Sequence, residues 1–356
     1  MKKAMIVTLF GEYNYGNRLQ NYAVSEFLKH YNIDSDTIKN IALLNENDKY
    51  FLRLIKYYLK SLFSSKQSET DKVRNKNFKI FDSNIKIDYQ NFNFFKINKY
   101  KRYDYYIVGS DQIWNCNFGC LRDFDLLTFT DSKNKISFSA SFGVDKLPNE
   151  YKEKTAKYLK QFKAISVREE TGKKIVEDLT GRKDVVVLVD PTMLLTNEEW
   201  DKVSKKPDNF PKKKYILNYF LGKLSDDRIK EINKVAKEND CEIINILDKN
   251  SPYYVCGPSE FIYLEKHAFL ICTDSFHSSV FAILYNRPFI VFNREDNNIS
   301  MNSRIDTLLK KFKLQDRYYN GKIDKKLLTC DYTESYKVLE KERQKAKDFL
   351  DKAISS

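Results

Sequence analysis

The 356-residue chain has no long hydrophobic run, only three histidines and no Cys-x-x-Cys pair among its six cysteines. No stretch approaches the roughly 20 apolar residues of a membrane-spanning helix. The apolar start, Met1–Gly11, is too short for the hydrophobic part of a secretory signal, so we expect a cytoplasmic protein. So few histidines and no paired cysteines argue against a structural zinc site, and we predict reduced thiols, no metal and no cofactor.

The formal net charge is +13. Such an excess suits an anionic substrate, an anionic membrane surface or nucleic acid. The lysines are scattered, so much of the excess also fits an ordinary solvated surface. Because no nucleic-acid-binding module is recognisable and the lysines do not cluster on one motif, we predict no nucleic-acid partner.

Short apolar runs alternate with amphipathic helical segments along the whole chain, which predicts an α/β fold with parallel sheets. A polar stretch with two prolines separates two such series. We therefore predict two Rossmann-like domains in a GT-B-like arrangement with a cleft between them. The predicted ranges are an N-terminal domain at 1–198, a linker at 199–214, a C-terminal domain at 215–330 and a C-terminal helix at 331–356.

Polar motifs follow several of the predicted strands in the first half. The loop Gly11–Arg18 joins a strand to a helix, where glycines permit close approach and a helix N-terminus favours an anion; a tight turn is the alternative. Gly109–Asn115 offers a carboxylate, amides and the indole of Trp114, which suits a sugar unless the indole lies in the core. Arg168 ends another strand and could grip a carboxylate or phosphate, or pair with Glu169 or Glu170.

The strongest local motif is Thr273–Ser279, which places three serines and His277 between a buried strand and a buried helix. A histidine titrates near neutral pH and can exchange a proton there. Arg304 follows the next strand, where it could hold an anion or form a surface salt bridge.

The segment 50–66 combines an apolar stripe with Arg53, Lys56 and Lys60. Such a basic amphipathic helix can lie on an anionic membrane. Packing of the stripe against its own domain is the alternative, and it is the one that we favour.

Taken in order, these segments resemble the polysaccharide pyruvyl transferase family over roughly residues 4–314. The segments that carry the resemblance are 13–23, 103–115, 139–143, 166–169, 190–200, 273–277 and 287–289. The resemblance implies phosphoenolpyruvate as donor and a hexose or hexosamine of a bacterial surface glycan as acceptor. It also implies an arginine and a histidine at the donor site, which correspond to Arg168 and His277. Many relatives carry arginine where this chain has Ser275, so either donor binding differs in this chain or another cation such as Arg304 or Arg18 substitutes.

These arguments give a set of predicted site residues. The catalytic residue is His277; the donor-binding residues are Arg168, Ser275, Ser278, Arg304, Asn17 and Arg18; the acceptor-binding residues are Asp111, Gln112, Trp114 and Asn14. The expected partners are phosphoenolpyruvate and a glycan acceptor, free or lipid-linked; contact with the inner membrane leaflet through 50–66 is the alternative to packing of that segment. The alternatives are a GT-B glycosyltransferase that uses a nucleotide sugar and a non-catalytic glycan-binding relative.

Overall fold

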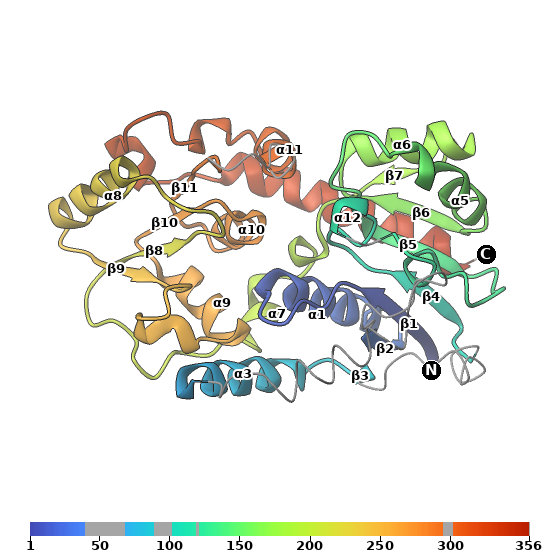
Figure 1. Cartoon of the computed structure of the whole chain (residues 1–356), viewed down its shortest axis with the longest axis horizontal. Helices are drawn as coiled ribbons and strands as arrows, with labels where there is room; N and C mark the ends of the chain where they lie inside the picture. The colour runs from blue at the N-terminus through green and yellow to red at the C-terminus, as the bar shows by residue number, and fades with distance from the viewer. Residues whose placement is uncertain (40–67, 89–101, 119–120, 295–301, 356) are drawn as a thin grey trace. The chain divides into compact units, whose positions relative to one another are not determined.

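The computed structural model describes residues 1–39, 68–88, 102–118, 121–294 and 302–355 (Figure 1). Within these residues the chain forms two compact units. The first comprises Met1–Lys72, Asp82–Leu194 and Lys345–Ser356, and the second comprises Val73–Phe81 and Leu195–Gln344. The units are thus discontinuous, unlike the contiguous ranges expected from the sequence, because α3 (Glu69–Asp82) and α12 (Thr333–Ser355) each contribute to both.

The first unit contains a parallel sheet of seven strands in the order β3-β2-β1-β4-β5-β6-β7. Its central strands are buried along their whole length, as expected where helices cover both faces. The strands are β1 (Lys2–Thr8), β2 (Ile33–Lys39), β3 (Ile87–Asp88), β4 (Tyr105–Val108), β5 (Lys135–Ala140), β6 (Ala164–Val167) and β7 (Val186–Val187).

Two helices of the first unit each have a recognisable cap at one end. Asn14 caps α1 (Tyr15–Lys29) by accepting the N–H of Asn17 at 3.0 Å. Gly181, with φ of 75°, ends α6 (Glu170–Thr180) in the left-handed conformation that favours glycine. Between them lies α5 (Asn149–Leu159), and short 3₁₀ turns occur at Cys116–Phe118, Phe124–Leu126 and Pro191–Met193.

The second unit contains a smaller parallel sheet in the order β11-β10-β8-β9. Its strands are β8 (Tyr215–Tyr219), β9 (Glu242–Asn245), β10 (Leu270–Thr273) and β11 (Phe289–Val291). Its helices are α7 (Asn197–Asp201), α8 (Asp226–Glu238), α9 (Pro258–His267), α10 (Phe276–Leu284) and α11 (Asn302–Phe312), with 3₁₀ turns at Pro252–Val255, Gln315–Arg317 and Lys325–Leu328. Polar loops at the carboxyl ends of β8, β10 and β11 therefore share one edge of this sheet.

Two further predictions concern the linker at 199–214 and the basic helix at 50–66. The start of the predicted linker is helical, since Thr196 and Glu199 form a capping box that opens α7. The predicted basic helix at 50–66 lies outside the described residues. No helix in the described ranges is both long and apolar enough to span a membrane.

Candidate active site

In the first unit, Arg168 is the centre of a buried charged cluster. Its Nη1 lies 2.6 Å from Asp190 Oδ2 and its Nη2 lies 3.5 Å from Asp111 Oδ1. Burial disfavours the charged guanidinium, but Asp190, Asp111 and Glu169 outweigh this effect, so the pKa of Arg168 is raised. We call Asp111, Arg168, Glu169 and Asp190 the Arg168 cluster. Its formal charges are one positive and three negative.

The cluster is tied to the loops around it. Asp190 Oδ2 also accepts the hydroxyl of Ser110 at 3.0 Å, and Asp190 Oδ1 accepts the backbone N–H and hydroxyl of Thr192. Asp111, with φ of 64°, accepts the side-chain amide of Asn17 at 2.5 Å. The structure thus brings together three predicted site residues: Asn17 from the first turn of α1, Asp111 from the loop after β4, and Arg168 just after β6.

Glu169, beside Arg168, fixes the loop after β5. Its Oε1 accepts the hydroxyl of Ser141 at 3.0 Å and the backbone N–H of Phe142 at 2.8 Å. Gly143 follows with φ of 60°, and a Cβ there would lie 2.2 Å from Gln112 Oε1. A side chain here would be strained at this φ and would displace the Gln112 side chain, so glycine is favoured.

Three predicted ligand-binding residues have structural roles instead. Trp114 is completely buried in the core of the first unit, where its ring packs against Phe142 and its Nε1 donates to the Asp125 carbonyl at 3.0 Å. An indole held in this way cannot stack on a sugar, so the acceptor role predicted for Trp114 is wrong. Gln112 is also buried, with Oε1 accepting from Asn115 at 2.7 Å, and it braces the turn rather than facing a ligand.

Arg18 is the third of these corrections. Its Nη1 donates to the Gly11 carbonyl, its Nη2 to the Glu12 carbonyl at 3.2 Å, and its Nε pairs with Asp82 at 3.2 Å. The guanidinium also lies 3.7 Å from the Phe10 ring centroid. Since these contacts hold the first loop in shape, Arg18 is not the cation that replaces a family arginine.

In the second unit, Asp274 holds together the loops at the sheet edge. Its two carboxylate oxygens accept the backbone N–H groups of Leu221 and Gly222, each at 2.7 Å. Its Oδ2 lies 3.1 Å from Nε of Arg294, a guanidinium that follows β11. Arg294 is not among the predicted site residues, although it is a cation just beyond a strand end, the same pattern that points to Arg168.

The N-terminus of α10 lies beside this ion pair in sequence and carries the predicted catalytic histidine. Ser275 occupies the cap position but makes no side-chain capping hydrogen bond. His277 is 7% exposed, and its ring contacts that of Phe276 edge-on at 5.3 Å. Arg304, from α11, lies with its guanidinium 6.0 Å from the Phe276 ring centroid. The start of α10 thus has Arg304 near Phe276 and, through Asp274, Arg294 paired just before it, and a helix N-terminus favours negative charge.

The side chain of Ser278 points into the interior of the second unit. It is fully buried, and its hydroxyl donates to Glu265 Oε1 on α9 at 2.6 Å. The donor-binding role predicted for Ser278 is therefore wrong, because the hydroxyl is directed into the unit. Ser275, Asn14 and Arg304 keep their predicted roles as predictions.

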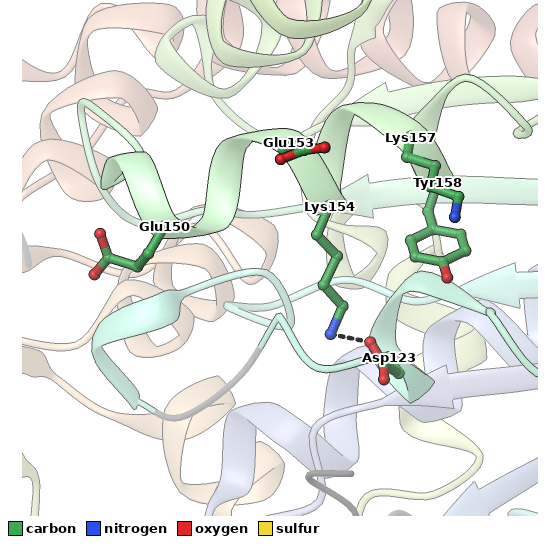
Figure 2. Close-up of a pocket in the computed structure, with 6 residues that line it drawn as sticks. All are labelled: Asp123, Glu150, Glu153, Lys154, Lys157 and Tyr158. Atoms are coloured by element: carbon green, nitrogen blue, oxygen red, sulfur yellow. Dashed lines mark ion pairs between the residues drawn. The ribbon is translucent and has the colours of Figure 1, made fainter. Parts of the chain in front are cut away.

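A cavity of about 380 Å³ lies elsewhere in the first unit (Figure 2). Figure 2 shows side chains of α5 over the loop that carries Asp123, with an ion pair between Lys154 and Asp123. None of the predicted site residues lines it. Within the described ranges, no group of three or more His, Cys, Asp or Glu side chains could hold a metal ion.

Comparison with known proteins shows the family to which the chain belongs. A family model described as polysaccharide pyruvyl transferase matches residues 14–297. The chain therefore belongs to the polysaccharide pyruvyl transferase family, whose name denotes a transferase acting on polysaccharide. No protein in the curated collection matches the chain.

Among solved structures, a UDP-N-acetylglucosamine 2-epimerase is similar at a TM-score of 0.52, with 11% identity over 99% of this chain and 95% of that one. A UDP-N-acetylglucosamine 2-epimerase from Listeria monocytogenes has a TM-score of 0.48, with 13% identity over 99% and 91% of the two chains. At such identities the likeness concerns the fold alone. Together with the two parallel sheets, it confirms the predicted GT-B-like α/β fold class.

Proposed function

We propose that this chain transfers a pyruvyl group from phosphoenolpyruvate to two hydroxyls of a hexose or hexosamine in a bacterial surface polysaccharide or its precursor. Family membership supports the transferase class. The observation that carries the donor assignment is the edge of the second unit at the start of α10, where Arg294 pairs with Asp274 and Arg304 lies near the ring of Phe276.

The charges of the two units favour different ligands. Phosphoenolpyruvate carries a carboxylate and a phosphate, and it needs fixed cations and N–H donors. The second unit offers Arg294 and Arg304 near the start of α10, where no side chain caps the helix. The carboxylate of Asp274 offsets part of this positive charge. In our proposal these two arginines supply the charge that many relatives obtain from an arginine at the position of Ser275.

The Arg168 cluster suits hydroxyls better than anions. Its guanidinium already faces Asp111 and Asp190, so a donor anion would have to displace a carboxylate. Carboxylates and amides are good partners for sugar hydroxyls. We therefore place the acceptor near Asp111, with Asn14 and Asn17 as neighbours, while the donor role of Arg168 stays a prediction.

The chemistry balances without a metal or redox partner. The methylene carbon of phosphoenolpyruvate gains a proton and becomes a methyl group, while a sugar hydroxyl oxygen bonds to C2. The C2–O bond to phosphate breaks, and a second hydroxyl closes the ketal as its proton leaves with phosphate. His277 is our candidate for carrying protons between hydroxyl, methylene carbon and leaving group, a role that contributes roughly 10²–10⁴-fold.

The test is incubation with phosphoenolpyruvate and a panel of lipid-linked and aryl glycosides. The proposal requires acceptor-dependent phosphate release and a product with the mass of a pyruvate ketal. Turnover of a nucleotide sugar instead would establish a glycosyltransferase, and glycan binding without either reaction would establish a non-catalytic relative. Salt-sensitive binding to anionic liposomes would test the separate prediction that 50–66 docks on a membrane.

A further inference from the structure

The second unit buries a carboxyl group directly behind the start of α10. Glu265 of α9 is 0% exposed, as is Ser278, the third residue of α10. The Ser278 hydroxyl donates to Glu265 Oε1 at 2.6 Å, and among the described residues Glu265 Oε2 has no hydrogen-bond partner. The two helices also pack through Phe261 and Phe281, whose ring centroids lie 6.0 Å apart.

The surroundings of Glu265 favour its neutral form. Burial raises its pKa well above the ordinary value, and the hydrogen bond from Ser278 offsets this only in part. From β8 it is faced by Tyr215 and Tyr219, whose own pKa values burial raises, with Glu265 adding to both. An ionised carboxylate here would sit unpaired in the interior and repel a bound anion.

Ser278 and His277 are neighbours in the first turn of α10, and the Ser278 hydroxyl is hydrogen-bonded to Glu265 on the buried side of this turn. The first turn of an α-helix leaves its N–H groups without partners inside the helix, so its position depends on side-chain contacts. The Ser278–Glu265 bond is a contact of this kind, and it reaches across to a second helix.

We propose that Glu265, as a neutral acid, is a positioning residue that fixes the first turn of α10, and with it His277 and the N–H groups that receive the donor anion. This inference rests on the proposed function for its link to phosphoenolpyruvate. The turn itself is fixed whether or not the donor is present.

The experiment compares Glu265→Gln, Glu265→Leu, Ser278→Ala and the Glu265→Leu/Ser278→Ala double variant with the natural chain. Glutamine keeps an acceptor oxygen and no charge, so its KM for phosphoenolpyruvate should stay within about twofold. Glu265→Leu and Ser278→Ala should raise this KM roughly tenfold, equivalent to about 1.4 kcal/mol. The double variant should be no worse than Glu265→Leu, since both changes break one bond.

Amide hydrogen exchange over residues 274–284 gives a second reading that needs no donor. Exchange should be faster in Glu265→Leu and Ser278→Ala, and unchanged in Glu265→Gln. If the natural chain does not bind phosphoenolpyruvate, the proposed function fails, but the exchange rates still decide whether Glu265 fixes the first turn of α10. Equal exchange in all variants, or a glutamine variant as impaired as the leucine variant, overturns the role of Glu265.

Discussion

Asp274 and Arg294 form a buried ion pair at the carboxyl edge of the second sheet, with Oδ2 and Nε 3.1 Å apart. The same carboxylate holds the N–H groups of Leu221 and Gly222, so one side chain sets both the loop after β8 and the direction of a guanidinium. Because Asp274 stands two residues before the start of α10, this relationship ties a cation to the turn that carries His277.

Replacing His277 tests the proposed proton transfer. His277→Ala should lower kcat by about 10²–10⁴-fold, because the general acid–base group is lost. The melting temperature, measured by calorimetry, should change by no more than a few degrees. His267→Ala is the matched control, since this exposed histidine lies on α9 of the same unit. Near-natural turnover in His277→Ala would show that the histidine carries no proton.

Replacing Arg168 separates a structural role from a donor-binding role. Arg168→Ala leaves Asp111 and Asp190 buried without their cation, so the free energy of unfolding should fall by about 3–5 kcal/mol. Lys173→Ala, which breaks a surface pair with Glu177, should cost under about 1 kcal/mol in the same urea titration. If Arg168→Ala is as stable as the natural chain but has lost affinity for phosphoenolpyruvate, Arg168 binds the donor and is not mainly structural.

The buried acid Glu265 should leave a signature in the pH dependence of stability. Its folded pKa lies above the unfolded value near 4.5, so folding takes up a proton between the two. Its contribution to stability therefore falls as pH rises above the unfolded pKa. Relative to Glu265→Gln, the natural chain should lose about 1.4 kcal/mol per pH unit until the folded group ionises. Urea titrations from about pH 5 to pH 8 measure this; a constant difference between the two proteins would contradict it.

Much of the fold follows from apolar runs that end in polar motifs. The apolar runs at Tyr105–Val108, Lys135–Ala140 and Ala164–Val167 form β4, β5 and β6. In contrast, local sequence does not predict β2, because Ile33 and Ile38 are its only apolar residues. Its Ser35 and Thr37 are buried all the same, since they hydrogen-bond to Ser25 and Asn21 of α1.

The site was only partly predictable, because a residue type does not say which way a side chain points. Arg18 in the first turn of α1 and Arg168 just after β6 are both buried, yet Arg18 donates to two backbone carbonyls and pairs with Asp82, while Arg168 faces Asp111 and Asp190. Ser278 and His277 are adjacent in sequence, but the Ser278 hydroxyl is directed into the unit, toward Glu265. These partners come from distant segments, so local sequence could not reveal them.

Donor binding by Arg294 is the most direct test of the account. Phosphoenolpyruvate is titrated calorimetrically into the natural chain, Arg294→Ala and Lys230→Ala, which removes an exposed cation of the same unit. A charge-assisted contact contributes about 1.5–3 kcal/mol, so Arg294→Ala should raise the Kd roughly tenfold to 150-fold while Lys230→Ala leaves it unchanged. An equal Kd for the natural chain and Arg294→Ala, or no binding to any of them, would contradict the assignment of the donor to the second unit.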